Sequence, residues 1–152
     1  MIESGLAGCL SRLLYFLFSS SKLRSYEQIC IDAFRTELPE EEKVILDEQM
    51  KVLSFIQRQA GGLKTVFYEG ALGKNDVSGI VFSNMAESHV VCAGMLVGKI
   101  SDSTIEVGFR IYTHRGRLFS IEYSSFPNVL SRADSLRVSL TGKKPKHGMQ
   151  SP

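Results

Sequence analysis

The sequence predicts an α+β fold: N-terminal helices packed on one face of an antiparallel β-meander of about five to six strands. Two observations indicate this. Through residues 5–60, apolar residues recur at helical spacing, and after Gly62 they alternate with polar residues at the period of a β-strand. The segments between the later apolar runs are short and rich in turn-forming residues, which favours hairpins over crossover connections.

Composition sets the first limits. The chain has 152 residues, a formal net charge of +2, 43% hydrophobic residues and 22% charged residues. This length suits one domain with a core of its own, and the apolar fraction excludes an intrinsically disordered chain. We expect a single domain over residues 1–141. Residues 142–152 are polar, basic and unpatterned, so we expect them to form a disordered tail.

The first predicted helix covers residues 5–18. Leucines recur along it at helical spacing, and aromatic residues extend its apolar surface nearly all round. A helix lying in a membrane interface would be rich in lysine and arginine, whereas this one carries only Arg12 and small serines on its polar side. We therefore expect Leu6–Phe18 to pack into the core or against a second copy of the chain.

Two further helices come next. Ser25 with Gln28 three residues later forms a capping box that opens the second helix. Pro39 followed by three glutamates predicts the start of a third, which we expect to continue to Ala60 and stop at the glycine pair 61–62. The apolar stripe of this third helix consists of Leu46, Met50, Leu53, Ile56 and Ala60.

Six later segments alternate in the manner of strands, over residues 64–69, 77–83, 89–99, 104–113, 117–125 and 135–141. A three-residue loop over 114–116 would place Ile111 opposite Phe119 and bring the apolar residues of one hairpin onto one face, with Gly116 in the left-handed conformation. The opposite face of that hairpin then shows Arg110, Tyr112, Ser120, Glu122 and Ser124. Glu122 lies diagonal to Arg110 in this register, near enough to form an ion pair.

The cysteines and the N-terminal region favour a cytoplasmic protein. Cys9, Cys30 and Cys92 are odd in number, widely spaced and set among apolar neighbours, so we expect free thiols in the core and a reducing compartment. The apolar run over residues 13–18 is too short for a signal peptide or a membrane-spanning helix.

No sequence motif indicates a catalytic reaction. The three histidines stand at no catalytic spacing from a cysteine or serine, and the HxH, HxxE and CxxC patterns of metal sites are absent from the sequence. The glycine-rich stretch over residues 70–74 lacks the frame of a phosphate-binding loop. We expect a protein that is not an enzyme and needs neither metal nor cofactor. The small charge surplus and the short tail without aromatic residues also argue against nucleic acid as a partner.

Charge distribution suggests where a partner would bind. Residues 23–62 contain eight acidic and five basic residues, whereas residues 135–152 contain four basic residues and no acidic ones. An acidic corner suits binding of a basic protein, and the polar face of the hairpin is the second candidate surface. The candidate partner-binding residues are Glu40, Glu41, Glu42, Asp47 and Glu48 on the third helix, and Arg110, Tyr112 and Glu122 on the hairpin.

One segment is similar to a known class of protein. The hairpin over residues 107–124, and within it the stretch Gly116-Arg-Leu-Phe-Ser-Ile-Glu-Tyr123, resembles the closing strands of bacterial toxin-immunity proteins of the contact-dependent growth inhibition type. The resemblance implies a small cytoplasmic protein without catalytic activity, which occludes the active site of a cognate toxin. Together with the acidic corner, it points to a basic toxin such as a nuclease.

Two alternatives stay open. A curved sheet covered by helices would suit a small-ligand-binding protein or a simple acid–base enzyme if its polar face formed a deep pocket around Glu122 or His89. A self-associating structural subunit is the other, with Leu6–Phe18 forming the interface of a homodimer.

Overall fold

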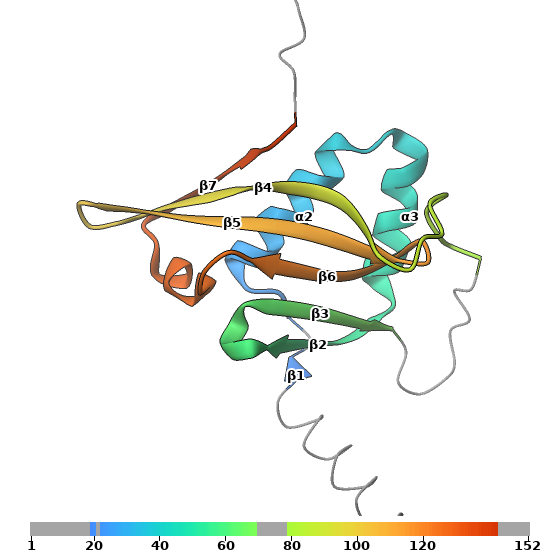
Figure 1. Ribbon diagram of the computed structural model, residues 1–152, viewed down its shortest axis with the longest axis horizontal. Helices are drawn as coiled ribbons and strands as arrows, with labels where there is room; N and C mark the ends of the chain where they lie inside the picture. Colours follow the sequence, from blue (N-terminus) through green and yellow to red (C-terminus); the bar gives the residue numbers. More distant parts are fainter. Residues whose placement is uncertain (1–18, 21, 70–78, 143–152) are drawn as a thin grey trace, which may run out of the picture.

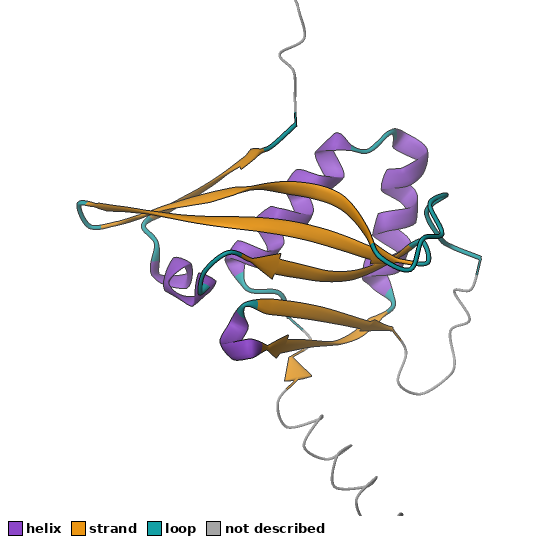
Figure 2. Cartoon of the chain, viewed as in Figure 1, coloured by secondary structure: helices purple, strands orange, loops and turns teal. Residues whose placement is uncertain are grey.

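The computed structural model describes residues 19–20, 22–69 and 79–142, and in this part of the chain two helices cover one face of a seven-stranded antiparallel sheet (Figure 1, Figure 2). The α+β fold class is confirmed. The helices are α2 (Ser25–Glu37) and α3 (Glu40–Lys51). The strands are β1 (Ser19–Ser20), β2 (Leu53–Gln59), β3 (Lys64–Glu69), β4 (His89–Ile100), β5 (Ser103–His114), β6 (Arg117–Tyr123) and β7 (Ser135–Leu140).

The sheet order is β1-β2-β3-β6-β5-β4-β7, with all neighbours antiparallel. The meander β4–β5–β6 forms its centre, while β3 pairs with β6 and β7 adds to the far side of β4. The chain therefore forms two sheet halves, β1–β2–β3 and β6–β5–β4–β7. These halves meet along three residue pairs between β3 and β6, centred on Thr65 opposite Ile121. The short 3₁₀ helices η1 (Ala60–Gly62) and η2 (Pro127–Arg132) fill two connections.

The start of α2 differs from the prediction by one residue. Arg24 is the N-cap, and its backbone N–H donates to Glu27 Oε2 at 2.7 Å. The predicted box of Ser25 and Gln28 is wrong, because Gln28 faces solvent and donates its amide to Asp32 one turn along the helix. Glu27 is instead the residue that points into the molecule, fully buried, so the buried carboxylate sets the position of the helix start.

Helix α3 begins where the proline and glutamates predict but ends at Lys51 rather than near Ala60. The predicted stripe beyond Met50 is wrong, because Leu53–Gln59 is strand β2 and pairs with both β1 and β3. Ile56 is buried in the core and Phe55 lies on the other face of the sheet. Two neighbouring strands supply hydrogen bonds along this segment, so tertiary pairing outweighs its helical spacing.

Five of the six predicted strands match to within two residues at either end, and 64–69 matches β3 at both ends. The predicted strand 77–83 is wrong over residues 79–83, which form no strand; Phe82 is buried there and its N–H donates to the carbonyl of Gly116 at 2.8 Å. The predicted helix Leu6–Phe18, Cys9, the stretch 70–74 and the tail from 143 onward lie outside the described residues.

The β5–β6 hairpin keeps Arg110, Tyr112 and Glu122 on the predicted face, but its register differs from the prediction, and Leu118 rather than Phe119 lies in the core. Its turn consists of Arg115 and Gly116, both with positive φ, so that His114 faces Arg117. A bulge then shifts the pairing, and Ile111 lies opposite Ile121 rather than Phe119. Phe119 is the extra residue of this bulge and is 37% exposed instead of joining the core.

Two cysteines belong to the core, as expected. Cys30 on α2 and Cys92 on β4 are free and buried. Burial raises the pKa of Cys92 to about 11, with a smaller contribution from Glu37. Burial likewise raises the pKa of Cys30, and the neighbouring Cys92 and Glu27 add to the effect. Both thiols are therefore protonated across the neutral range.

We expect Cys30 and Cys92 to react with iodoacetamide at pH 8 about 100-fold more slowly in the folded protein than in urea, because the thiolate is the reactive form. Peptide mapping by mass spectrometry measures both rates. Above about pH 9 the thiols ionise in the unfolded chain but stay protonated in the folded one, so the free energy of unfolding should fall as pH rises. Equal rates in folded and unfolded protein would contradict this account.

Candidate functional site: the uncovered sheet face

The face of the sheet opposite the helices carries the second group of predicted residues, and we call it the uncovered face because no helix of the described residues packs on it. The strand pairing sets Ala93, Arg110, Glu122 and Lys64 opposite one another in one row across β4, β5, β6 and β3. Tyr112 lies two residues from Arg110 along β5 and therefore on the same face. The structure thus brings Arg110, Tyr112 and Glu122 together on one surface.

A groove of about 430 Å³ opens beside this row. Its residues come from β4, β5 and β6, with one contribution from the end of β7, and they are Ala93, Gly94, Gly108, Phe109, Arg110, Tyr112, Glu122, Tyr123, Ser124 and Thr141. Ala93 contributes only a methyl group to the groove, whereas a Cβ at Gly108 would lie 3.1 Å from Ser124 Oγ, so the Ser124 side chain occupies the space beside Gly108. Gly108 also binds Ser124 twice: its N–H donates to Ser124 Oγ at 2.8 Å, and its carbonyl accepts the N–H of Ser124 at 2.9 Å.

The ion pair on this face differs from the predicted one. Glu122 lies directly opposite Arg110, but its carboxylate forms an ion pair with Lys64 Nζ on β3, with Nζ and Oε1 2.9 Å apart. The same ammonium lies 5.6 Å from the ring centre of Phe119, a favourable cation–π arrangement. Across residues 19–20, 22–69 and 79–142, Arg110 makes no ion pair and no side-chain hydrogen bond, and it is exposed.

The acidic group of the third helix lies in the helical layer, on the other side of the sheet. Three of its five carboxylates are paired with nearby cations: Glu40 with Lys43 at 2.5 Å, Glu48 with Lys51 at 2.5 Å, and Asp47 with Arg35 at 2.8 Å. The hydrogen bond from Lys43 lowers the pKa of Glu40, and that from Arg35 lowers the pKa of Asp47. Glu41 and Glu42 form no ion pair with any described residue.

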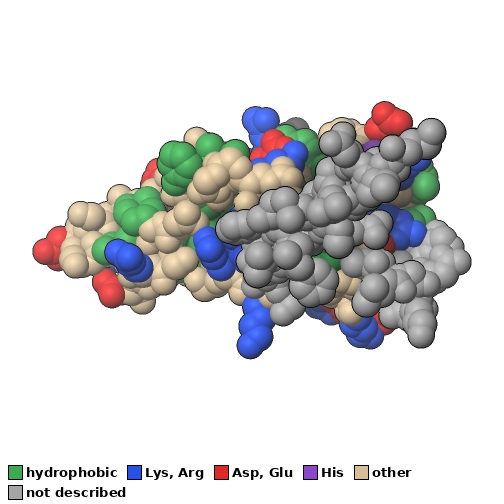
Figure 3. Space-filling model, turned by 90° about the horizontal axis from the view of Figure 1, so that it is seen from below, with side chains coloured by type: hydrophobic (Ala, Val, Ile, Leu, Met, Phe, Trp, Pro, Cys, Tyr) green, Lys and Arg blue, Asp and Glu red, His purple; other side chains and the backbone are tan. Residues whose placement is uncertain are grey.

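The two predicted surfaces therefore lie on opposite sides of the sheet and form no continuous patch. The α2–α3 connection, residues 38–39, projects past β4 in Figure 1, and the groove opens on the β4–β5–β6 side of the uncovered face. Seen from below, the part of the surface that is coloured carries basic and acidic side chains interspersed with hydrophobic ones (Figure 3). The two surfaces are therefore separate candidates for a partner.

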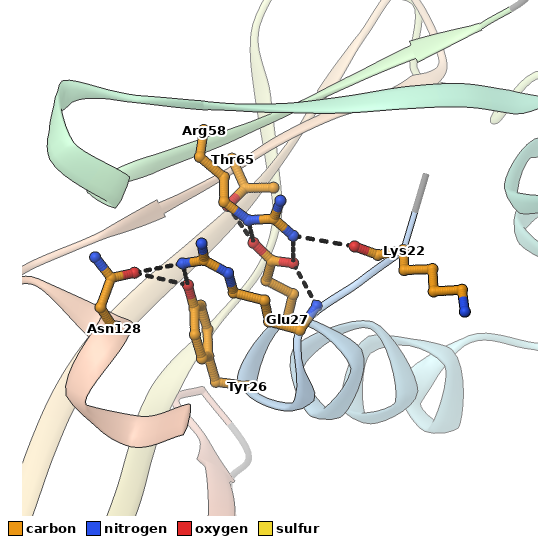
Figure 4. Close-up of polar contacts among 7 residues, drawn as sticks. Lys22, Tyr26, Glu27, Arg58, Thr65 and Asn128 are labelled. Carbon is orange, nitrogen blue, oxygen red and sulfur yellow. Dashed lines mark hydrogen bonds and ion pairs between the residues drawn. The ribbon is translucent and has the colours of Figure 1, made fainter. Parts of the chain in front are cut away.

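A buried ion pair joins the helical layer to the sheet (Figure 4). Glu27 is fully buried, and Arg58 of β2 donates to both of its oxygens, through Nε at 2.8 Å and Nη2 at 2.6 Å. Thr65 of β3 adds a hydroxyl donor at 2.9 Å. Burial by itself would lower the pKa of Arg58, but the hydrogen bonds to Glu27 outweigh this and raise it. Every lone-pair direction of this carboxylate faces a donor, so the cluster holds the fold rather than a ligand.

A buried amide performs a similar role at the other end of the helical layer. Gln49 of α3 is 1% exposed and donates Nε2 to the carbonyls of Ile80 at 2.9 Å and Gly116 at 3.0 Å. Its Oε1 accepts the N–H of Leu118 at 2.8 Å. These bonds satisfy the backbone at the β5–β6 turn, where the bulge interrupts the ladder.

Neither buried group stands out in the sequence. The charge pattern places Glu27 in an acidic stretch, and the helical spacing places Gln49 and Arg58 in one long third helix. The position of Glu27 could have indicated its role. It is the third residue of its helix, where a carboxylate can accept a hydrogen bond from the backbone N–H of the N-cap.

Comparisons with protein-family models, with curated proteins and with solved structures return no match for this chain. Its function must therefore be inferred from the arrangement of its own side chains. Within the described ranges, no three His, Cys, Asp or Glu side chains gather in a group that could hold a metal ion, and no helix is long and apolar enough to span a membrane. His114 contacts the carbonyl of Glu87 and lies 5.7 Å from the ring centre of Phe119.

Proposed function

We propose that this protein is a cytoplasmic immunity-type inhibitor, which binds a cognate bacterial toxin and occludes the toxin's active site without catalysing a reaction. The observation that carries the proposal is the pair of side chains on the uncovered sheet face: Arg110 and Tyr112 stand side by side, and Arg110 has no partner within the described chain. Arginine and tyrosine are among the residue types most often found at the energetic centre of protein interfaces. The resemblance of residues 107–124 to immunity proteins adds support, since it covers these same strands.

The acidic corner gives this proposal its expected partner. Glu41 and Glu42 stand at the start of α3 without an ion-pair partner among the described residues, beside a helix connection that projects from the molecule. Unpaired carboxylates at the edge of an interface steer a positively charged partner and speed its association, while contributing less to the lifetime of the complex. A basic toxin such as a nuclease fits this surface.

The proposal predicts that Arg110→Ala and Tyr112→Ala each weaken binding of the toxin by about 10- to 100-fold. Binding is measured by isothermal titration calorimetry against candidate basic toxin domains, such as nucleases, and protection by survival of cells that express the toxin that binds. Arg137→Ala is the matched control, because Arg137 is also an exposed arginine on a strand of the same sheet but lies outside the groove.

Glu41→Lys combined with Glu42→Lys should instead slow association and reduce its dependence on salt, because these charges act before contact forms. If the wild-type protein neither binds the toxin nor protects cells, the inhibitor function is wrong. If Arg137→Ala weakens binding as much as Arg110→Ala, the groove is not the centre of the interface.

A small-ligand-binding protein is the second candidate, and the size of the groove favours it. Its volume of about 430 Å³ lies within the range of small-molecule sites. The groove opens on an exposed face rather than enclosing a ligand, which weakens this alternative. A metabolite that raises the melting temperature of the wild-type protein but not of Tyr112→Ala would favour it over the inhibitor.

A further inference from the structure

We infer that the groove on the uncovered face is a carboxylate-binding site, occupied by an aspartate or glutamate side chain of the partner protein. Arg110 supplies the guanidinium, and Tyr112, Ser124 and Thr141, which carry hydroxyl groups, line the same groove. This inference rests on the proposed function and identifies the chemistry of the partner at that surface.

The charges of the row show why Arg110 is available. Glu122 is the nearest carboxylate in the strand register, but Lys64 engages it at 2.9 Å from the opposite side. Two cations and one anion therefore share this row, and the uncompensated positive charge falls on Arg110. An arginine presents a planar fork of N–H donors that matches the two oxygens of a carboxylate.

The hydroxyl groups add donors without adding charge. Ser124 Oγ already accepts the N–H of Gly108 at 2.8 Å, so its own hydrogen is free to point elsewhere. Neither Tyr112 nor Thr141 makes a side-chain hydrogen bond to another described residue. The small side chain of Ala93 borders the groove on β4, directly opposite Arg110 in the strand register.

Because the groove is exposed, we expect a carboxylate on a partner protein to bind it more tightly than a free small carboxylate. In water, an exposed arginine holds an isolated carboxylate only weakly, because both ions remain hydrated and salt screens their attraction. A partner protein that covers the groove excludes water and strengthens the same ion pair. Enzymes that cleave polymers commonly use carboxylates as acid–base groups or metal ligands. An inhibitor that pairs its arginine with such a carboxylate would block the active site directly.

The first test uses the full-length, ¹⁵N-labelled protein with sodium acetate as the probe. Acetate at high concentration and constant ionic strength should shift the Nε–Hε signal of Arg110, identified by its loss in Arg110→Lys, more than that of Arg137, because the hydroxyl groups of the groove add donors to a weak ion pair. The neutral isostere acetamide should shift neither signal. If acetate moves Arg110 no more than Arg137, or if inorganic phosphate binds Arg110 more tightly than acetate, the carboxylate site is wrong.

The second test uses charge reversal in the toxin complex. Arg110→Glu should weaken binding by about 100-fold or more, and exchange of one active-site carboxylate of the toxin for lysine should restore at least about tenfold of that loss. Arg110→Glu that binds and protects like wild type would overturn the inference while leaving the inhibitor function intact. Selective acetate binding at Arg110 in a protein that neutralises no toxin would instead overturn the inhibitor function and retain the site.

Discussion

Exchange of Glu27 for glutamine should lower the free energy of unfolding by about 3–5 kcal/mol, the largest effect expected for any single substitution proposed for this chain. The glutamine fits the same space but removes the negative charge, which leaves the Arg58 guanidinium buried beside a neutral amide. One amide hydrogen would also point at a donor, either Arg58 or the N–H of Arg24. Urea denaturation followed by circular dichroism measures the loss.

Two further variants test whether the loss of stability depends on the burial of the Glu27–Arg58 ion pair. Asp47→Asn removes a carboxylate that Arg35 also binds with two hydrogen bonds, but the side chains of that pair are 42% and 44% exposed, so its loss should be much smaller. The double variant Glu27→Gln/Arg58→Gln removes the unpaired cation and should recover about 1 kcal/mol or more relative to Glu27→Gln. A loss for Glu27→Gln no greater than that for Asp47→Asn would show that the buried pair does not stabilise the fold.

Truncation of Gln49 to alanine should cost about 2–4 kcal/mol, because the carbonyl of Ile80 and the N–H of Leu118 lose this partner and the carbonyl of Gly116 keeps only the N–H of Phe82. The carbonyls of Ile80 and Gly116 and the N–H of Leu118 all bond to this one amide, and the site is closed to water. The substitution should also loosen the β5–β6 turn, which the amide secures from the helical side. Denaturation in urea measures the first effect, and hydrogen exchange of the Leu118 amide measures the second.

Gln59→Ala is the control for Gln49. Gln59 is half-buried at the end of β2 and donates its amide to another side chain, Gln57, so no backbone group depends on it. Its truncation should change the free energy of unfolding only slightly and leave the exchange of Leu118 unchanged. Unchanged exchange at Leu118 in Gln49→Ala would mean that the bulge is held by the strands alone.

Local pattern was sufficient for most of the strands and for the start of α3, because alternation and helix-start residues act over a few positions. It failed over residues 53–59, where Leu53 and Ile56 continue the helical spacing of Leu46 and Met50 equally well. Pairing with β1 and β3 decides between helix and strand, and β3 is a separate segment of the chain. The bulge at Phe119 could not be predicted from the hairpin sequence for the same reason, because Gln49 of α3, a distant residue, accepts the hydrogen bond from the Leu118 N–H beside it.

In the candidate site too, the features set by local sequence could be predicted and those set by long-range pairing could not. Alternation alone placed Arg110, Tyr112 and Glu122 on one face, because all three belong to a single hairpin. The partner of Glu122 could not be predicted, since Lys64 reaches it only through the β3–β6 pairing between the two sheet halves. The buried pair of Glu27 and Arg58 likewise joins a helix to a strand 31 positions away.

The joint between the two sheet halves has a kinetic consequence. Thr65 and Ile121 are 56 positions apart in the chain, whereas the β4–β5 and β5–β6 hairpins close over turns of two residues. The loss of chain entropy on closing a loop grows with loop length, so the three residue pairs of this joint demand more ordering than either hairpin. Thr65, at the centre of the joint, also donates to Glu27. The closure of the sheet with the largest loss of chain entropy thus brings together the residues that surround the buried ion pair. The Glu27 carboxylate therefore affects both the folding step that joins the two sheet halves and the stability of the folded protein.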